Sequence, residues 1–481
     1  MSFDKILVAG TWRPSESGET LPVVSPSDGR EFTRIARGSA RDIDAAVRAA
    51  RRAFEGTWGR IPALERGRLL HKLGELVLAN ADELAALEAR DTGKPLKQAR
   101  TDVGVTARYF EFFAGAADKI HGETIPFLSG YQVMILREPR GVTGHIIPWN
   151  YPISMFGRTI APTLAAGNTA VLKPAEEACL SCIRMAELAM EAGIPAGVVN
   201  VVTGLGEEAG AALSGHPGID LISFTGSPEV GTLIQKAAAE NHIPCILELG
   251  GKSPQIIFED ADIDKAADTT VNAIIQNAGQ TCSAGSRVLI QRSVYEKVMA
   301  ELKRRFNRLK VGPHELDLDV GAVITRNQQT RVQAFLDRAA ADGIEAVAMG
   351  SMHEKADPDG YFVRPTLLNL VPEDHTLARD EVFGPVLAAI VFDDEADALR
   401  IANATDYGLV AGIWTENGGR QMRMAKGVRA GQVFINGYGA GGGIELPFGG
   451  SKRSGHGREK GLESLKELTA AKTIVFNHGN A

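Results

Sequence analysis

Cysteine is scarce in this sequence: 481 residues contain only Cys179, Cys182, Cys245 and Cys282. A chain of this length buries a large core without cross-links, so the low count excludes a disulfide scaffold and indicates a reducing compartment. Cys179 and Cys182 have the spacing of a redox pair or of half a zinc site, but no second Cys/His pair follows at zinc spacing. Because their segment has a helical pattern, we interpret both as small packing residues. No metal site is predicted.

Long apolar runs and clusters of positive charge are also missing. No uninterrupted apolar stretch is long enough to cross a bilayer, and the segment Met1 to Lys5 lacks the regions of a signal peptide. We therefore expect a cytoplasmic protein without membrane contact. The formal net charge is −7, and no Lys/Arg run is long enough to follow a phosphate backbone, so nucleic-acid binding is not expected.

The pattern of apolar residues changes along the chain. After a short strand-and-turn start, apolar residues recur at helical spacing over 41–54, 62–90 and 97–117. Between 142 and 249, short Val/Ile-rich runs alternate with helical segments. This alternation predicts a parallel sheet with helices on both faces, which binds ligands at the carboxyl ends of its strands.

A second α/β stretch begins near Gly250 and continues to about residue 450, with strands expected near 386–392 and 432–435. Two further β-prone runs, 131–137 and 471–476, lie outside both α/β stretches. We expect these two runs to form an arm that pairs with another subunit.

Cys282 is a candidate nucleophile because of its neighbours. It lies in a loop of small and polar residues, Gly279 to Gly285, just before an expected strand at 286–291. A reactive thiolate needs access, and backbone N–H groups or a nearby cation lower its pKa. The alternative is a small buried packing residue, the usual fate of a free cysteine. The small side chains on both sides favour a crowded site that a substrate must approach.

Glu248 is a candidate general base. It ends an apolar strand and is followed by Gly250 and Gly251, so little side-chain bulk covers its carboxylate. Partial burial would raise its pKa towards the range that is useful for activating water. A simple ion pair with Lys252 is the alternative interpretation.

Asn150 lies between Pro148 and Pro152, which stiffen the loop after an expected strand. A fixed amide in such a loop can donate a hydrogen bond to an oxyanion, a contact that lowers a barrier by about 3 kcal/mol. An Asx turn that only ends the strand is the alternative.

A nucleotide site is predicted where a strand at 220–225 leads into a helix at 227–239. Ser227 suits the N-cap position, and Gly226 would let a diphosphate approach the helix N-terminus, which favours anions. Lys173 and Glu176 follow another strand and could hold ribose hydroxyls, while Glu176 would repel a 2′-phosphate. The common G-x-G-x-x-G fingerprint is missing, so that motif alone predicts no dinucleotide site.

Seven segments together resemble the aldehyde dehydrogenase superfamily in identity, order and spacing, and the match covers essentially the whole chain. They are PWNYP (148–152), KPAE (173–176), FTGS (224–227), ELGGKSP (248–254), GQTCSAGSR (279–287), EVFGPV (381–386) and PFGGSKRSGHGRE (447–459).

The resemblance implies an α/β fold: a Rossmann-like parallel-sheet cofactor domain, an α/β catalytic domain and a small β oligomerisation arm. The cofactor domain would comprise 1–120 and 140–249, the catalytic domain 250–451, and the arm 121–139 and 466–481. A homodimer or homotetramer is implied.

The resemblance also implies that an aldehyde is oxidised with NAD, or alternatively NADP, through a covalent thiohemiacetal and thioester. Cys282 would be the nucleophile, Glu248 the general base, and Asn150 with the Cys282 backbone N–H the oxyanion hole. The residues implied at the cofactor are Lys173, Glu176, Gly226, Ser227, Trp149, Glu381 and Phe383. Because Glu248 is a carboxylate, hydrolysis is expected rather than transfer to coenzyme A.

Two features bear on the substrate, which is expected to be a semialdehyde or a bulky or aromatic aldehyde. Arg158 lies where some semialdehyde-oxidising relatives bind a substrate carboxylate, although it could equally support its helix. The glycine-rich loop 437–443 has few large side chains and would admit a bulky substrate. Two other functions are weighed, a non-catalytic structural protein and a thioesterase-like hydrolase; the intact site and nucleotide residues argue against both.

Overall fold

The computed structural model describes residues 3–439 and 443–479. Its first large sheet has the strand order β2-β1-β9-β8-β7-β10-β11-β23. Its five central strands are parallel, which confirms the parallel sheet expected between 142 and 249. In spatial order they are β9 (Val199–Val201), β8 (Thr169–Pro174), β7 (Val142–Ile147), β10 (Leu221–Thr225) and β11 (Cys245–Glu248). The edges are antiparallel and consist of β1 (Ile6–Val8), β2 (Thr11–Arg13) and β23 (Gly455–His456).

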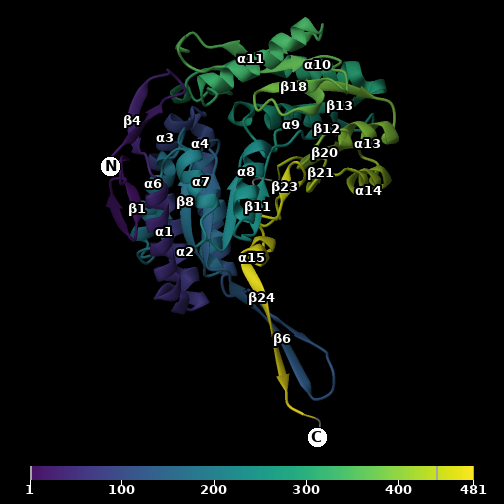
Figure 1. Cartoon of the computed structure of the whole chain (residues 1–481). Coiled ribbons are helices and arrows are strands. Elements are labelled where there is room, and N and C mark those ends of the chain that lie inside the picture. The colour runs from purple at the N-terminus through teal and green to yellow at the C-terminus, as the bar shows by residue number, and fades with distance from the viewer. Residues whose placement is uncertain (1–2, 440–442, 480–481) are drawn as a thin grey trace.

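Helices cover both faces of this sheet, and each face has its own apolar cluster (Figure 1). The larger cluster joins the sheet to α2 (Ala63–Ala79), α3 (Ala81–Thr92), α4 (Leu96–Ala116), α5 (Pro152–Ala165) and α6 (Leu180–Glu191). The other face packs against α1 (Ala40–Glu55), α7 (Ala211–Ser214) and α8 (Pro228–Ala239). Cys182 lies in α6 and Cys179 at its N-cap, and both are buried.

Two expected helices differ in the structure. The single helix expected over 62–90 is broken at Asn80, whose side-chain amide and backbone N–H both donate to the Leu76 carbonyl, at 2.7 and 3.1 Å. An Asn side chain that binds a neighbouring carbonyl competes with the helical ladder, so α2 ends there and α3 begins. One of the helical segments expected between 142 and 249 begins as a π-helical turn over Gly206–Gly210, directly before α7.

The second large sheet has the order β15-β17-β18-β13-β12-β20-β21 and is parallel except for β15. Its strands are β15 (Ala346–Met349), β17 (Thr366–Leu368), β18 (Val386–Phe392), β13 (Arg287–Gln291), β12 (Pro254–Ile257), β20 (Val410–Trp414) and β21 (Gln432–Ile435). One face packs against α9 (Ile263–Ile275) and α10 (Tyr295–Phe306). The other packs against α11 (Arg326–Ala341), α13 (Glu395–Asn403) and α14 (Gly418–Gly427).

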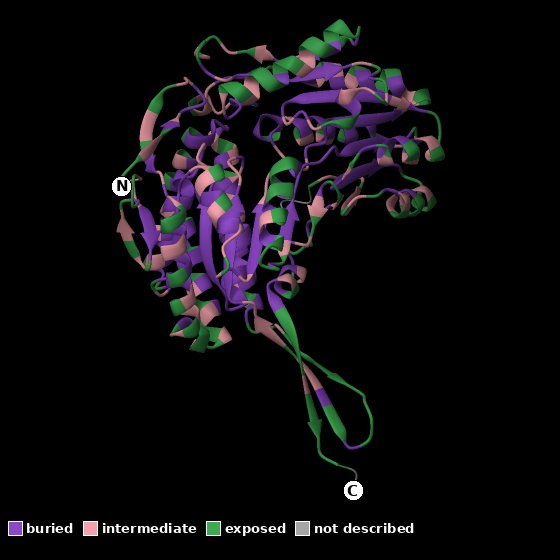
Figure 2. Cartoon of the chain, in the orientation of Figure 1, coloured by how far each residue is buried: buried purple, intermediate pink, exposed green. Residues whose placement is uncertain are grey.

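The arm is a separate three-stranded sheet that projects away from both large sheets (Figure 1). β6 (Tyr131–Pro139) pairs along its full length with β24 (Thr469–Asn477), and β5 (Glu123–Ile125) pairs with the other side of β6. Much of the arm is exposed (Figure 2), including apolar side chains such as Leu136 and Phe476. Exposed apolar strands of this kind favour pairing with another chain.

Short elements complete the chain. They are the hairpin β3 (Thr20–Val24) and β4 (Glu31–Ala36), the pairs β14 (Lys310–Val311) with β16 (Ser351–Met352) and β19 (Tyr407–Gly408) with β22 (Ser451–Lys452), and the helices α12 (Thr376–Arg379) and α15 (Glu463–Glu467). Within residues 3–439 and 443–479, no helix is both long and apolar enough to cross a membrane.

A buried ammonium group ties three segments of the first α/β unit together. The Lys94 Nζ donates to a carboxylate oxygen of Glu88 at 3.0 Å, to Asp102 at 2.8 Å and to the Asn150 carbonyl at 3.0 Å. Burial alone would lower the pKa of Lys94, but the two carboxylates outweigh it and the pKa is raised. The interaction fixes α3, α4 and the loop after β7 to one another.

Replacing Lys94 by methionine should therefore destabilise the protein by about 3–5 kcal/mol, because two buried carboxylates lose their cation. Denaturant unfolding followed by far-UV circular dichroism measures the change. Lys297→Met on the exposed side of α10 is the matched control and should leave the midpoint unchanged. A Lys94→Met protein as stable as the control would contradict this account of the cluster.

Candidate active site

A cavity of about 870 Å³ lies where the carboxyl ends of several strands meet. Its walls include the segments directly after β7, β10 and β11, as expected for parallel sheets. Of the residues singled out from the sequence, nine line it: Trp149, Asn150, Arg158, Gly226, Ser227, Glu248, Cys282, Glu381 and Phe383. Lys173 and Glu176 are not among its lining residues.

Cys282 is half-buried in a loop whose backbone is unusually constrained. Asn277 and Ala278 have left-handed backbone conformations, with φ of 49° and 54°. A Cβ at Gly279 would lie 2.2 Å from the Gly384 carbonyl oxygen, so only glycine fits there. Burial raises the pKa of the Cys282 thiol to about 11, with the Arg158 guanidinium opposing the shift.

Asn150 is held at both its backbone and its side chain. Its Nδ2 donates to the Gln280 carbonyl at 2.8 Å, and its own carbonyl accepts from the Lys94 Nζ and, at 2.8 Å, from the Asn277 Nδ2. The bond to Gln280 uses one of the two hydrogens on the Asn150 amide and orients the other. The Asn150 amide is therefore bound to the residue two positions before Cys282 and keeps one hydrogen free to donate.

Glu248 ends β11 and is only 2 % exposed. Among the described residues, neither of its carboxylate oxygens has a hydrogen-bond partner. Burial raises the pKa of Glu248 well above its usual value, and the nearby Glu459 carboxylate adds to the shift. The closest cation is Arg158, whose Nη2 lies 3.8 Å from Oε2. The ion pair with Lys252 weighed above is therefore not the arrangement found.

Arg158, on α5, lines the cavity and lies close to two buried carboxylates, those of Glu248 and Glu459. Its Nε forms an ion pair with the Glu459 Oε2, and its Cζ lies 4.3 Å from the ring centroid of Phe448. The other Glu459 oxygen accepts from the Ser223 hydroxyl at 3.1 Å. Sequence reasoning assigned no role to Glu459, although it ends the matched segment 447–459, because only the tertiary structure brings it to Arg158.

Three residues that line the cavity, Tyr151, Thr281 and Tyr438, were given no role by the sequence analysis. The Tyr151 hydroxyl and Thr281 Oγ1 lie 2.7 Å apart and link the loop after β7 to the residue before Cys282. Tyr438 donates to the Ser283 carbonyl at 2.6 Å on the other side of Cys282. Residues 440–442 of the glycine-rich loop lie outside the described residues.

Glu381, Phe383 and Trp149 form a second group in the cavity. The Glu381 carboxylate accepts from the Gly251 N–H at 2.9 Å, and burial raises its pKa to about 7. A Cβ at Gly250 would lie 2.2 Å from the same carboxylate. The rings of Trp149 and Phe383 meet edge to face with centroids 5.5 Å apart. These residues form an aromatic wall and provide a carboxylate that can accept hydrogen bonds from sugar hydroxyls.

The α8 N-terminus completes an anion-binding edge. The Ser227 side chain accepts from the Val230 N–H at 3.3 Å, which confirms the predicted N-cap. Gly226 precedes it, and a Cβ there would lie 2.4 Å from the Phe224 ring. Free N–H groups at such a helix end suit a diphosphate, so these residues fit a dinucleotide without the usual glycine fingerprint.

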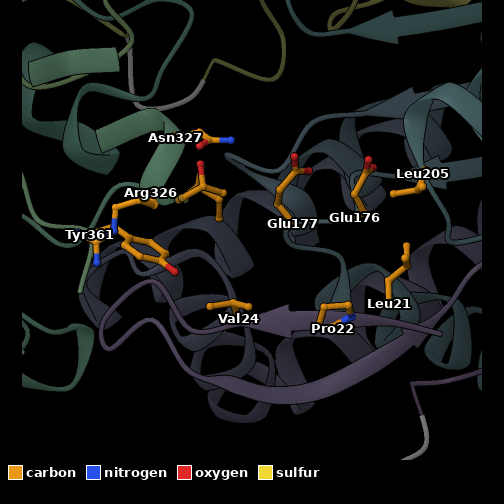
Figure 3. Close-up of a pocket in the computed structure, with 11 residues that line it drawn as sticks. Leu21, Pro22, Val24, Glu176, Glu177, Leu205, Arg326, Asn327 and Tyr361 are labelled. Atoms are coloured by element: carbon orange, nitrogen blue, oxygen red, sulfur yellow. The ribbon is translucent and has the colours of Figure 1, made fainter. Parts of the chain in front are cut away.

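Glu176 lines a second, smaller cavity of about 360 Å³ (Figure 3). The Lys173 Nζ lies 2.5 Å from the Glu176 Oε2, and Oε1 of the same carboxylate accepts from the Gly206 N–H at 3.1 Å. Glu176 and Glu177 give this cavity two carboxylates, while Arg326 lies across it beside Tyr361.

Comparisons with known proteins point to one family over nearly the whole chain. The model of the aldehyde dehydrogenase family matches residues 12–474. An aldehyde dehydrogenase of Emericella nidulans is 42% identical over 466 residues, covering 96% of this chain and 93% of the relative. A crystal structure of a putative aldehyde dehydrogenase from Burkholderia cenocepacia has a TM-score of 0.98 and 61% identity, covering 99% of this chain and 100% of the other.

An aldehyde dehydrogenase from Bacillus cereus in complex with NAD+ has a TM-score of 0.96 and 40% identity, covering 99% of this chain and 97% of that structure. The chain belongs to the aldehyde dehydrogenase family and is an oxidoreductase that oxidises aldehydes with NAD(P).

Proposed function

We propose that the enzyme converts an aldehyde to a carboxylic acid through a covalent intermediate on Cys282, with hydrolysis as the last step. The observation that carries this proposal is the arrangement of one cavity. A thiol, an oriented amide of Asn150 and the buried carboxylate of Glu248 without hydrogen-bond partners all line it. These are the groups that thiol addition, oxyanion binding and water activation require.

The proposed reaction begins when the Cys282 sulfur, as thiolate, adds to the aldehyde carbon and the carbonyl electron pair moves to oxygen. The Asn150 amide and the Cys282 backbone N–H donate to that oxyanion. When bound, the nicotinamide ring would supply the hydride acceptor: the former aldehyde carbon loses its hydrogen as hydride, the oxyanion electron pair re-forms the carbonyl, and a thioester remains on Cys282. Glu248 then takes a proton from water as the water oxygen attacks the thioester carbonyl, and the carbon–sulfur bond breaks to release the acid and the Cys282 thiolate.

The raised pKa of Glu248 suits this role. A carboxylate stabilised by several hydrogen bonds would be a weak base, whereas burial makes proton uptake favourable. Arg158, 3.8 Å away, opposes the shift because its positive charge favours the ionised carboxylate.

For the cofactor we propose roles by position. Gly226 and Ser227 would face the diphosphate at the α8 N-terminus, and Lys173 with Glu176 the adenosine ribose. Glu381, Phe383 and Trp149 would hold the nicotinamide ribose and ring. The preference for NAD over NADP follows from Glu176 and Glu177, which place negative charge where a 2′-phosphate would be added.

The proposed substrate is a semialdehyde or a bulky aromatic aldehyde. The cavity wall is rich in apolar and aromatic side chains, among them Val105, Tyr109, Tyr438 and Phe448. Arg158 is a candidate contact for a substrate carboxylate. Its guanidinium is already paired with Glu459.

We further propose a division into a cofactor domain (1–120 and 140–249), a catalytic domain (250–451) and an arm (121–139 and 466–481). The separation of the two large sheets supports this division, and the exposed apolar side chains of the arm support a homodimer or homotetramer. A cytoplasmic location is proposed from the low cysteine content.

Alkylation by iodoacetamide in the absence of nucleotide tests the state of Cys282. Because burial raises the pKa of the thiol to about 11, the thiolate is a minor species at neutral pH. The rate should rise about tenfold per pH unit between pH 7 and 9, since only the thiolate reacts. Cys282→Ala is the control for labelling of half-buried Cys245. A rate that is flat over this range would show that the thiolate is already formed and that our account of its environment is wrong.

Glu248→Gln tests the hydrolytic step. The amide cannot accept a proton from water, so one equivalent of NADH per active site should form rapidly and steady-state turnover should fall by at least about a hundredfold. Rapid-mixing absorbance at 340 nm measures both phases, and the exposed Glu354→Gln is the matched control. If Glu248→Gln turns over at the wild-type rate, Glu248 has no part in the mechanism. If the wild-type enzyme mainly hydrolyses esters without NAD, the hydrolase alternative is favoured.

Glu176→Gln tests cofactor choice. Wild-type enzyme should have the higher kcat/KM with NAD. The variant should gain about tenfold or more in kcat/KM with NADP, because removing one unit charge near a phosphate is worth about 1–2 kcal/mol. Initial rates with both cofactors at fixed aldehyde concentration decide the point. A wild-type preference for NADP would overturn the assignment.

A further inference from the structure

The hydroxyl of Tyr151 is a cavity group that the proposed mechanism does not use. Tyr151 follows Asn150 in the loop after β7, and its oxygen lies 2.7 Å from the Thr281 Oγ1. Asn150 binds the Gln280 carbonyl, one residue earlier in the loop that carries Cys282. Two adjacent residues of one loop therefore hold two adjacent residues of the other, directly before the proposed nucleophile.

Neighbouring hydrogen bonds fix the direction of the bond between the two hydroxyls. The Gln98 Nε2 on α4 donates to the Tyr151 oxygen at 3.3 Å. The Thr281 hydroxyl donates to the Gln276 carbonyl at 3.4 Å. Because each hydroxyl has one hydrogen, Tyr151 donates to Thr281. The Gln98 Oε1 also accepts from the Asn277 N–H at 3.0 Å, so one side chain of α4 supports both ends of this short loop.

The backbone that leads to Thr281 is strained. Asn277, Ala278 and Gly279 have positive φ values of 49°, 54° and 75°. Left-handed conformations at residues other than glycine persist only where the surrounding structure maintains them. The bonds made by Gln98 and Tyr151 are part of that surrounding structure.

The bond from Tyr151 bears on the peptide between Thr281 and Cys282. The Thr281 carbonyl accepts from the Ala284 N–H at 2.9 Å, while its side chain accepts from Tyr151. A trans peptide is planar, and its N–H points away from its C=O. Holding both the side chain and the carbonyl of Thr281 therefore sets the direction of the Cys282 N–H. In the proposed mechanism this N–H binds the oxyanion together with the Asn150 amide.

We propose that Tyr151 is a positioning residue that acts through Thr281 to aim the Cys282 N–H at the oxyanion. This inference rests on the proposed function, because it assumes that an oxyanion forms on the carbon bound to Cys282. The oxyanion is common to all aldehydes, so loss of the Tyr151 hydroxyl should slow every aldehyde by a similar factor. A hydroxyl that contacts the substrate would instead affect different aldehydes unequally.

The test starts from Tyr151→Phe, which removes only the hydroxyl. It should lower kcat/KM with NAD about ten- to a hundredfold for both benzaldehyde and hexanal, because a misdirected oxyanion donor can cost that much. Alkylation of Cys282 by iodoacetamide forms no oxyanion, so its rate should stay within about threefold of wild type. The matched control is Tyr295→Phe. The Tyr295 hydroxyl lies outside the cavity, donates to the Asn369 Oδ1 at 2.8 Å and accepts from the Leu370 N–H at 3.2 Å.

Thr281 provides the second arm of the test. Thr281→Val should lower kcat/KM by a factor similar to that of Tyr151→Phe, whereas Thr281→Ser keeps the hydroxyl and should stay within about threefold of wild type. Because both hydroxyl deletions remove the same bond, Tyr151→Phe/Thr281→Val should lose no more than about twofold beyond either single variant. Quenching of tryptophan fluorescence by NAD verifies that each variant is folded.

The outcomes separate this inference from the proposed function. If Cys282→Ala oxidises aldehydes at the wild-type rate, the proposed function itself fails. If Cys282→Ala is inactive but Tyr151→Phe is no slower than Tyr295→Phe, only the role of Tyr151 is overturned. That role is also overturned if the two aldehydes are slowed unequally, if alkylation slows as much as oxidation, or if the losses of the two single variants multiply in the double variant.

Discussion

The hydrogen bond from the Asn150 amide to the Gln280 carbonyl joins the two halves of the site, and the rest of the geometry depends on it. Asn150 follows a strand of the first sheet, whereas Gln280 belongs to the loop that leads into the second. Lys94 and Asn277 fix the Asn150 carbonyl, and the Gln280 side chain accepts from the Ile324 N–H at 2.9 Å. Each partner is itself buried and paired, so the distance between the amide and Cys282 is set by a network rather than by one contact.

The site concentrates buried charge, which a stable protein normally avoids. The Lys94 cluster pairs its carboxylates closely and serves as a support outside the chemistry. The Glu248 carboxylate, in contrast, lies 3.8 Å from Arg158 and has no hydrogen-bond partner among the described residues. Incomplete satisfaction of a buried carboxylate is destabilising, and it is also what keeps the group basic. The two clusters therefore show opposite solutions to the same desolvation problem, one for rigidity and one for reactivity.

Sequence reasoning succeeded where the information is local. Strands at 386–392 and 432–435 begin and end at the expected residues because short Val/Ile-rich runs between turns have few alternatives. It failed at Asn80, where a side-chain hydrogen bond overrides apolar periodicity. It also missed β23 as a strand of the first sheet, since the pairing of Glu248 with Gly455 joins residues about two hundred positions apart in the sequence.

The same contrast between local and long-range information explains which residues of the candidate site were predicted from the sequence. Cys282, Glu248 and Asn150 were identified because each lies in a distinctive local segment. Glu459 and Lys460 reach the site only because β23 returns the chain to the first sheet and the bonds between Phe448 and Glu459 turn it back. That return brings one carboxylate and one ammonium to a guanidinium from α5. The charge balance around Glu248, and with it the basicity of the group, is thus a property of tertiary structure that no single segment encodes.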